Sequence, residues 1–484
     1  MKTSVIEAII DGHAPLVERG RTIGRAEYRR RWAAVQKAMA AQGYDLLYAC
    51  GSELDRSDTA WLAGIFDPII ERYGLLVPRS GTPVAVAGSE GGHVIEDCVR
   101  ASGAGVALLR EFQISDEDYR FAQFGSLEDV VASLVPLRAG RPGAGRPVRI
   151  AVSSSGQFLP HDHMLMLQGR FGADNVVFDT HLLRRIKYEK SPQELRTIGA
   201  AAVIADAAFL GMLGTMEPGV RELDVAAVGD YIMKRLGAGR TGFPTIVSSG
   251  TRGRSVLGPA TNRVIGRGEF VSLGVSPSFN GYHGIMRRTV KAGAERTFPE
   301  EEFFAALEGL YHVVLNAASE AARRGHPSCR IDAAGKAYLD GTKLKDKHGR
   351  LRTPHEPYTF LHNTGCSECQ EGFGAVTPYT DEPLGTNIAL MIDVAFLGFD
   401  EKKKLVFPVE YAVIEDGLWK SGPALGVYNR MPLDVQDLVG REMIEIPADR
   451  VNPNYRPYPG TNKPGKKETM SRRAAFNSKK ARPL

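Results

Sequence analysis

Residues 269–290, EFVSLGVSPSFNGYHGIMRRTV, are the stretch that decides the fold of this chain. It opens with a short apolar run at 270–275, and from 282 to 290 it returns to residue types that favour β-strands. The segment between them contains a proline, which fixes one turn dihedral, and an Asn-Gly pair, which tolerates positive φ. The pattern therefore predicts two strands joined by a wide turn.

Two adjacent arginines, Arg287 and Arg288, stand where the returning strand should enter the interior. Burial of an unpaired charge is costly, because the charge loses its hydration and gains nothing in exchange. We therefore expect both side chains to meet carboxylates or solvent, and the pair is a candidate clamp for an anionic substrate.

The stretch also resembles a known family. The frame G-D/E-x-V-x-L, followed by G-Y and then R-T, resembles the central strands of the creatinase/aminopeptidase P/methionine aminopeptidase (M24) superfamily, which has the pita-bread fold. In its metallopeptidases this hairpin supplies two aspartate metal ligands, and the matching positions here hold Ser272 and Ile285. Neither is a useful ligand for a hard dication. The spacing from Ser272 to the Gly281-Tyr282 pair is closer to the metal-free creatinase branch.

The 484 residues predict two domains of mixed α+β class. In residues 1–183, short apolar runs alternate with helical segments, as in an N-terminal α/β domain similar to that of creatinase. A Ser-Pro-x-Glu capping box at 191–194 starts a long helix and opens a pita-bread domain at 184–444. We expect residues 445–484 to form a basic, extended tail.

Several single elements are predicted as well. Helical spacing of apolar residues predicts helices over 22–42 and 299–326. A strongly apolar strand is predicted at 387–398. The segment 404–420 is predicted to be the last hairpin arm, with a turn at its Asp-Gly pair.

The composition favours a soluble, cytoplasmic protein. The five cysteines are scattered and odd in number, which is typical of a reducing compartment, and the N-terminus has no pattern of a signal peptide. No apolar run approaches the roughly 18 residues that a membrane span requires. The net charge of +5 is concentrated in 462–484, where eight Lys/Arg stand against one Glu. We therefore expect neither a membrane nor nucleic acid as partner, but a small molecule and a second copy of the chain.

The resemblance implies five metal ligands in the peptidase members: two Asp, one His and two Glu. The matching positions here hold Ser272, Ile285, Cys366, Asp393 and Glu410. The cysteine is assigned because its segment, FLHNTGC, resembles the HGxGH segment of the family. Since two carboxylates and one thiol remain, no dinuclear metal centre and no cofactor are expected. A single metal ion held by the cysteine and the two carboxylates remains open.

The creatinase branch implies a different site. There a histidine is the general acid/base, glutamates hold a guanidinium and arginines hold a carboxylate. The matching positions place Leu257 at that histidine, Arg287 at a glutamate, and Glu71 at a substrate-contacting arginine. Because Arg287 would repel a guanidinium, substrates of that type are disfavoured.

Two histidines could carry a proton instead. Strand alternation places His283 on the face of Arg287, and neighbouring cations would keep its pKa low and its ring neutral. His362 matches a histidine that lines the substrate pocket in the peptidases. Each could equally be a hydrogen-bonded structural residue. Asp393 and Glu410 would form a carboxylate pair that either takes part in acid/base chemistry or neutralises the arginines.

The sequence thus predicts a metal-independent hydrolase or lyase of the creatinase type, acting on a small polar, carboxylate-bearing molecule. The alternatives are a non-catalytic pita-bread binding protein and a Xaa-Pro metallopeptidase. A homodimer is expected, with Glu71 reaching the neighbour's pocket. The candidate catalytic residues are His283, His362, Asp393 and Glu410, and the candidate substrate-binding residues are Arg287, Arg288, Glu71, Tyr282, Cys366 and Arg252.

Overall fold

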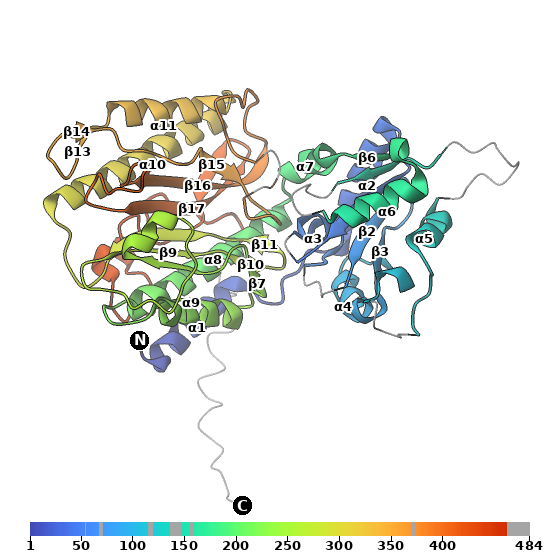
Figure 1. Ribbon diagram of the computed structural model, residues 1–484, viewed down its shortest axis with the longest axis horizontal. Coiled ribbons are helices and arrows are strands. Elements are labelled where there is room, and N and C mark those ends of the chain that lie inside the picture. Colours follow the sequence, from blue (N-terminus) through green and yellow to red (C-terminus); the bar gives the residue numbers. More distant parts are fainter. Residues whose placement is uncertain are drawn as a thin grey trace, which may run out of the picture.

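The computed structural model describes residues 1–53, 55–66, 71–114, 120–135, 147–153, 159–369, 371 and 374–461. Figure 1 shows two units side by side, each built of helices packed on a sheet. The predicted class, an α/β domain followed by a second mixed domain, is confirmed. The strongly basic segment 462–484 lies outside the described residues.

The N-terminal domain is built on a mixed sheet with the order β4-β3-β2-β1-β5-β6. Its central strands are apolar along their whole length because helices cover both faces of the sheet. The strands are β1 (Leu46–Gly51), β2 (Tyr73–Pro78), β3 (Val84–Ala87), β4 (Gly105–Leu108), β5 (Ile150–Val152) and β6 (Val176–Phe178). The helices are α2 (Arg25–Gln42), α3 (Ser57–Ala63), α4 (Ser89–Val99), α5 (Leu127–Leu134), α6 (His161–Phe171) and α7 (Thr180–Tyr188), with 3-10 turns at Arg110–Phe112 and Ala173–Asn175.

The C-terminal domain centres on an antiparallel sheet with the order β15-β16-β17-β12-β9-β8, and β18 pairs with β17. A small sheet, β11-β10-β7, lies beside it. The strands are β7 (Arg240–Thr241), β8 (Ile246–Ser249), β9 (Phe270–Val275), β10 (Pro277–Phe279), β11 (Tyr282–His283), β12 (Met286–Lys291), β13 (Leu344–Lys345), β14 (Leu351–Arg352), β15 (Phe360–Asn363), β16 (Asn387–Leu397), β17 (Tyr411–Ser421) and β18 (Ala424–Val427). The helices are α1 (Thr3–Val17), α8 (Pro192–Thr215), α9 (Glu222–Leu236), α10 (Phe298–Arg324) and α11 (Cys329–Gly341), with 3-10 turns at Gly250–Ser255, Gln436–Leu438 and Ala448–Arg450.

Strict alternation divides the central sheet into an apolar face and a polar face. Val271 and Leu273 of β9 pack against α8 and α9, and Ile392 and Val394 of β16 pack against α10. In Figure 1, α8 and α9 lie along one half of the sheet and α10 lies along the other half. The residues between these apolar ones therefore point to the face away from the helices, and the candidate site lies on that face.

Helix α8 begins as predicted. The Ser191 side chain accepts a hydrogen bond from the Glu194 amide, and the Glu194 carboxylate accepts one from the Ser191 amide. By length and composition α8 could cross a membrane, but its whole apolar window is buried inside the protein. The hydropathy of α8 therefore reflects its position in the core.

The predicted hairpin is present, with one difference in its second arm. Asn280 and Gly281 both have positive φ, as the Asn-Gly turn requires. After the turn, His283 lies in β11, which pairs with β10 outside the central sheet. The chain then passes so close to α8 that a Cβ on Gly284 would lie 2.5 Å from the Ala201 backbone. Because the strand is interrupted here, His283 does not share a face with Arg287.

The turn predicted at the Asp-Gly pair within 404–420 is wrong. β17 runs through Asp416 and Gly417 without a break. The Asp416 carboxylate accepts hydrogen bonds from Arg288 and Tyr311, and the Gly417 amide donates to the Asn429 side chain. Partners distant in sequence therefore hold this pair in the sheet.

Both ends of the described chain belong to the C-terminal domain. Helix α1 packs on α8 and α9, with Ile9 and Ile10 in the same apolar core. Residues 445–461, which the sequence suggested were part of an extended tail, pack on the domain. There Tyr458 contacts Trp419 edge to face.

A buried arginine joins the two domains. Arg31 of α2 is 1% exposed and donates to Glu27, to the Trp61 carbonyl and to the Tyr282 hydroxyl at 2.8 Å. Its Nη2 also lies 3.4 Å from Glu194 of α8. The guanidinium thus neutralises carboxylates of both domains where no water reaches them.

Replacing Arg31 by methionine should destabilise the protein by about 3 kcal/mol or more, because the substitution leaves the buried Glu194 carboxylate without its cation. Its neighbour Arg30 also pairs with Glu27, but its side chain is 53% exposed. Arg30→Met should therefore cost less than about 1 kcal/mol. Urea unfolding followed by circular dichroism compares the two variants. Equal shifts of the midpoint would contradict the role assigned to Arg31.

Candidate functional site

Side chains from neighbouring strands form a row across the polar face of the central sheet. Backbone pairing places Gly274 of β9 opposite Arg287 of β12, Arg287 opposite Glu415 of β17, and Glu415 opposite Asp393 of β16. We call these four residues the central row. Residues paired directly across antiparallel strands point to the same face, so their side chains meet.

Arg287 is the centre of the row and is 2% exposed. Its Nη1 donates to Glu415 Oε2 at 3.1 Å and to Asp393 Oδ2 at 3.4 Å. Its Nη2 donates to the Tyr411 hydroxyl at 2.8 Å and to the Val256 carbonyl at 3.3 Å. Val256 has a φ of 64°, which is strained for a β-branched residue, so the loop holds this carbonyl at a conformational cost.

Gly274 makes room for the arginine. A Cβ at position 274 would lie 2.8 Å from Cγ of Arg287 and 3.3 Å from the Ile246 side chain. Any larger residue at 274 would therefore push the Arg287 stem out of place. Glycine at 274 and arginine at 287 depend on each other.

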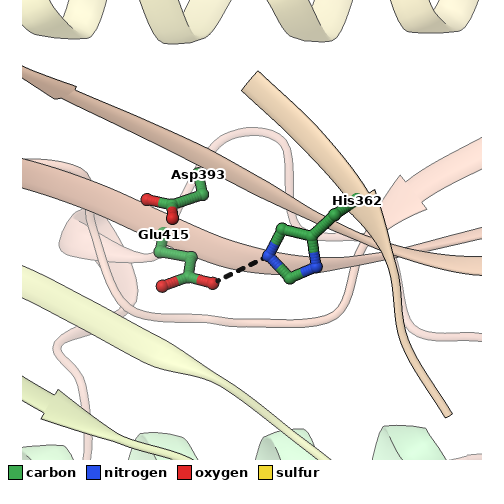
Figure 2. Close-up of side chains that lie close together, drawn as sticks. All are labelled: His362, Asp393 and Glu415. Carbon is green, nitrogen blue, oxygen red and sulfur yellow. Dashed lines mark ion pairs between the residues drawn. The ribbon is translucent and has the colours of Figure 1, made fainter. Parts of the chain in front are cut away.

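Figure 2 shows His362 of β15 pointing towards Glu415, with Asp393 beside the pair. The His362 Nε2 lies 3.5 Å from Glu415 Oε1. Burial lowers the pKa of His362, but the hydrogen bond to Glu415 and the charge of Glu368 outweigh burial and raise the pKa to about 9. Burial and the charge of Glu415 raise the pKa of Asp393. The cluster therefore holds protons on His362 and Asp393, with Arg287 and Glu415 charged.

The residues do not fit the dinuclear metal centre that the resemblance implies. The residue of β9 that faces the row is Gly274, two positions beyond Ser272, and neither residue offers a ligand of the aspartate type. Ile285 offers none either. Cys366 points into another environment, where it faces Lys187 and Glu371. The set that would bridge two ions is therefore absent.

A single ion would need different donors. Among the described residues, His362, Asp393 and Glu415 are the group whose ligand atoms come together, all within 4.8 Å of one another. However, the Arg287 guanidinium donates to both of these carboxylates. A dication bound there would lie beside a fixed positive charge, which would repel it. The site as it stands is neutralised from within the chain.

A cavity of about 210 Å³ lies between the two domains, beside the row. One wall comes from the N-terminal domain and the linker helix α7, and the other from β7, β11 and the segment after β15. We call it the interdomain cavity. Its lining residues are Asp55, Arg56, Ser57, Asp58, Ser153, Arg184, Lys187, Thr241, Gly242, His283, Cys366, Ser367, Glu368 and Cys369.

The two walls of the interdomain cavity differ in charge. Lys187 on the first wall is neutralised by Asp58 at 2.9 Å and by Glu371, whereas Arg184 has no salt bridge among the described residues. Glu368 stands on the second wall. The Ser153 hydroxyl, which is 3% exposed, has no hydrogen-bond partner among the described residues. A polar ligand could satisfy this hydroxyl and Arg184 together.

Several predicted site residues meet at these two places. His283 and Cys366 line the interdomain cavity, and Arg287, Asp393 and His362 meet at the row. Burial lowers the pKa of His283 to about 4, so its ring is neutral as expected. Burial is the main cause, and the charge of Arg56 lowers the pKa of His283 further. Burial raises the pKa of the Cys366 thiol to about 12, so the thiol is not ionised.

The structure does not bring the predicted carboxylate pair together. Glu410 precedes β17, and its nearest cation is Arg254 at 3.9 Å. Glu415, five residues later, is the residue opposite Asp393. The single metal site considered for Cys366, Asp393 and Glu410 is therefore not formed. Arg288 is no partner of Arg287 in a clamp, because adjacent strand residues point to opposite faces.

Three other predicted substrate contacts also have partners within the chain. Tyr282 donates to Glu194 at 3.1 Å and accepts from Arg31. Arg252 pairs with Glu222 and donates to the Pro259 carbonyl, outside the interdomain cavity. Glu71 is 5% exposed and accepts from the Gly91 amide at the start of α4. The contact of Glu71 with the pocket of a second copy stays a prediction.

Four residues of these two places were not predicted from the sequence: Glu415, Gly274, Glu368 and Arg184. For Glu415 a signal was present, because alternation in 411–421 places 415 on the polar face and 410 outside the pattern. The assumed Asp-Gly turn concealed this signal. Gly274, Glu368 and Arg184 had none, since their roles depend on neighbours that only the fold supplies.

The sequence model of metallopeptidase family M24 matches residues 196–405. The Xaa-Pro dipeptidase of Pyrococcus furiosus is 30% identical over 169 residues, which is 34% of this chain and 44% of that protein. The match thus spans less than half of this relative. The probable dipeptidase PepE of Mycobacterium tuberculosis is 27% identical over 350 residues, 70% of this chain and 79% of that protein.

Solved structures share the fold at low sequence identity. The prolidase from Pyrococcus horikoshii OT3 has a TM-score of 0.61 at 16% identity, covering 85% of this chain and 100% of that one. Dipeptidase PepE from Mycobacterium ulcerans has a TM-score of 0.63 at 21% identity, covering 86% and 99%. The predicted pita-bread architecture is confirmed by these structures.

The prediction of a metal-independent hydrolase or lyase of the creatinase type is wrong. These named relatives are Xaa-Pro dipeptidases and probable dipeptidases, and the matching family is one of metallopeptidases. The prediction was based on the few positions that match metal ligands. Residues at a few positions do not determine which branch of a family a whole domain resembles most. Residues 196–405 of this chain thus match metallopeptidase family M24, and the chain shares its fold with prolidase and dipeptidase structures.

Proposed function

We propose that this chain binds short peptides in the interdomain cavity and does not hydrolyse them by the two-metal chemistry of its superfamily. The observation that carries the proposal is the cavity itself, which places Arg184 on one wall and Glu368 on the other. A short peptide carries a carboxylate and an amine at its two ends. Opposite charges on the two walls match these ends.

The remaining lining supports a small polar ligand. The Ser153 hydroxyl and the neutral His283 ring can exchange hydrogen bonds with a peptide group. The volume of about 210 Å³ suits a ligand of a few residues and excludes a folded chain. The names of the relatives, Xaa-Pro dipeptidase and dipeptidase PepE, support short peptides as the ligand class.

A second candidate is a Xaa-Pro dipeptidase that uses one metal ion. The observation in its favour is the group His362, Asp393 and Glu415, whose ligand atoms lie within 4.8 Å of one another. This function requires that the Arg287 guanidinium leave the two carboxylates. We rank it second because Arg287 is buried and donates to both of them.

The dipeptide Ala-Pro should bind to the wild-type protein, as measured by isothermal titration calorimetry. Arg184→Met should weaken the binding about 10-fold or more, because a charge-assisted hydrogen bond to the carboxylate is lost. Arg185 is the adjacent, exposed arginine of α7, and Arg185→Met is the matched control. Equal affinities of the two variants, or no binding to the wild type, would refute the proposal.

Metal content distinguishes the two candidate functions. Wild-type protein dialysed against Mn²⁺ or Zn²⁺ should retain no ion at the central row. Arg287→Ala should gain one ion per chain, because His362, Asp393 and Glu415 then form an uncompensated ligand set. Mass spectrometry of the native protein counts the ions. Arg288→Ala, on the opposite face of the sheet, is the control that should bind none.

One or two ions on the wild-type chain, with cleavage of Ala-Pro, would reject the first function. One ion with cleavage would establish the second candidate. Retained Ala-Pro binding without ions or cleavage is the expected result.

Stability should fall as the pH rises from 6.5 towards 9. His362 has an ordinary pKa of 6.5 and a pKa of about 9 in the folded protein, where it faces Glu415, Asp393, Glu368 and Arg287. The folded state therefore holds this proton more tightly than the unfolded state. Its contribution is complete below pH 6.5 and is lost as the pH passes through about 9.

Urea unfolding at several pH values measures this dependence. The raised pKa of Asp393 acts in the same direction, since the folded state again binds the proton more tightly. In His362→Gln the fall in unfolding free energy over this range should be smaller than in the wild type. Identical pH dependence of the two proteins would show that the neighbours of His362 do not raise its pKa.

A further inference from the structure

We propose that peptides longer than two residues bind with their N-terminus in the interdomain cavity and their following residues along β7, as an added strand. This inference rests on the proposed function and extends it to oligopeptides. The site is a groove of about 680 Å³ between α9 and β7. We call it the α9 groove, and it is lined by Arg56, Leu223, Ala226, Asp230, Met233, Lys234, Ala238, Gly239, Arg240, Thr241, Pro244, Thr245, Pro259 and Ala260.

The α9 groove continues the interdomain cavity. Arg56 and Thr241 line both of them. A peptide that fills the smaller cavity therefore has a direct path into the larger groove past these two residues.

The strand β7 has an open edge at this groove. Within the described residues it pairs only with β10. The Gly242 amide donates to the Ser276 carbonyl, and the next pair, Thr241 with Pro277, is therefore of the non-hydrogen-bonded kind. In such a pair the amide and carbonyl point away from the partner strand. The Thr241 backbone is thus available to an extended peptide, as in strand addition.

One face of α9 forms the other side of the groove. Leu223, Ala226 and Met233 recur at helical spacing along it, and Leu223 is 40% exposed. Pro244 and Pro259 complete an apolar lining. Since alternate side chains of an added strand point to the same side, every second residue of the peptide would contact this lining. The groove therefore favours peptides with apolar residues at alternate positions.

The charges fix the direction of the peptide. Glu368 lines the cavity and feels the charges of His362 and Glu415, so it stands at the end of the cavity nearer the central row. Arg56 stands at the junction with the groove. An N-terminal amine therefore fits at Glu368, and the chain leaves past Arg56. A dipeptide ends within the cavity, so its carboxylate stays there, whereas a longer peptide carries its carboxylate into the open groove.

Calorimetry with Ala-Pro and with Ala-Pro-Ala-Leu-Ala-Leu tests the inference on the full-length protein. The hexapeptide should bind about 10-fold more tightly than Ala-Pro. Acetylation of its N-terminus should abolish binding. Amidation of its C-terminus should have no effect, whereas amidation of Ala-Pro should weaken binding about 10-fold.

A pair of leucine variants locates the bound peptide. Leu223→Asp should lower the affinity of the hexapeptide to that of Ala-Pro. The affinity of Ala-Pro itself should not change. Leu351→Asp, at an exposed leucine of β14, is the matched control and should change neither affinity.

The possible failures are distinguishable. The extended site is refuted, and the proposed function stands, if Ala-Pro binds and one of three results is found. These are a hexapeptide affinity no higher than that of Ala-Pro, hexapeptide binding that survives N-terminal acetylation, or a hexapeptide affinity that Leu223→Asp does not change. If neither peptide binds, the proposed function itself is refuted.

Discussion

The structure of the central site depends on one buried guanidinium that donates hydrogen bonds to two carboxyl groups. Arg287 donates to Glu415 and Asp393 in a sheet interior that excludes water. There a carboxylate without a cation would be strongly destabilising, so some positive charge has to stand between β12 and β17. In this chain the Arg287 side chain supplies that positive charge. The surrounding residues follow from it, because Gly274 leaves space for the side chain and Val256 accepts from its outer nitrogen.

The central row can vary without loss of the fold. The sheet pairing and the apolar cores on the helix side do not involve the ligands, so they can be retained while the polar face changes. What changes is the chemistry that the face supports. A guanidinium neutralises and orients carboxylates, but it cannot act as a Lewis acid on a peptide carbonyl. The remaining polar opening is the interdomain cavity, which Arg31 stabilises by joining the two domains.

Sequence patterns were reliable where the cause is local. The capping box of α8, the Asn-Gly turn after β10 and the burial of Arg287 all follow from residues a few positions apart or from the cost of isolated charge. The patterns failed where a distant partner decides. Asp416 and Gly417 remain in β17 because Arg288, Tyr311 and Asn429 bind them, although the pair is typical of a turn. The resulting error moved the second carboxylate from Glu415 to Glu410.

By itself, the sequence determined the α/β domain followed by a second mixed domain and the central hairpin, because residue type and alternation are properties of the chain. Only the tertiary structure decided which carboxyl groups meet Arg287, that His283 leaves the sheet before Gly284, and that Arg184 and Glu368 line the same cavity. These outcomes depend on register and on domain packing. Both are set by contacts between residues hundreds of positions apart, for which no single segment carries a signal.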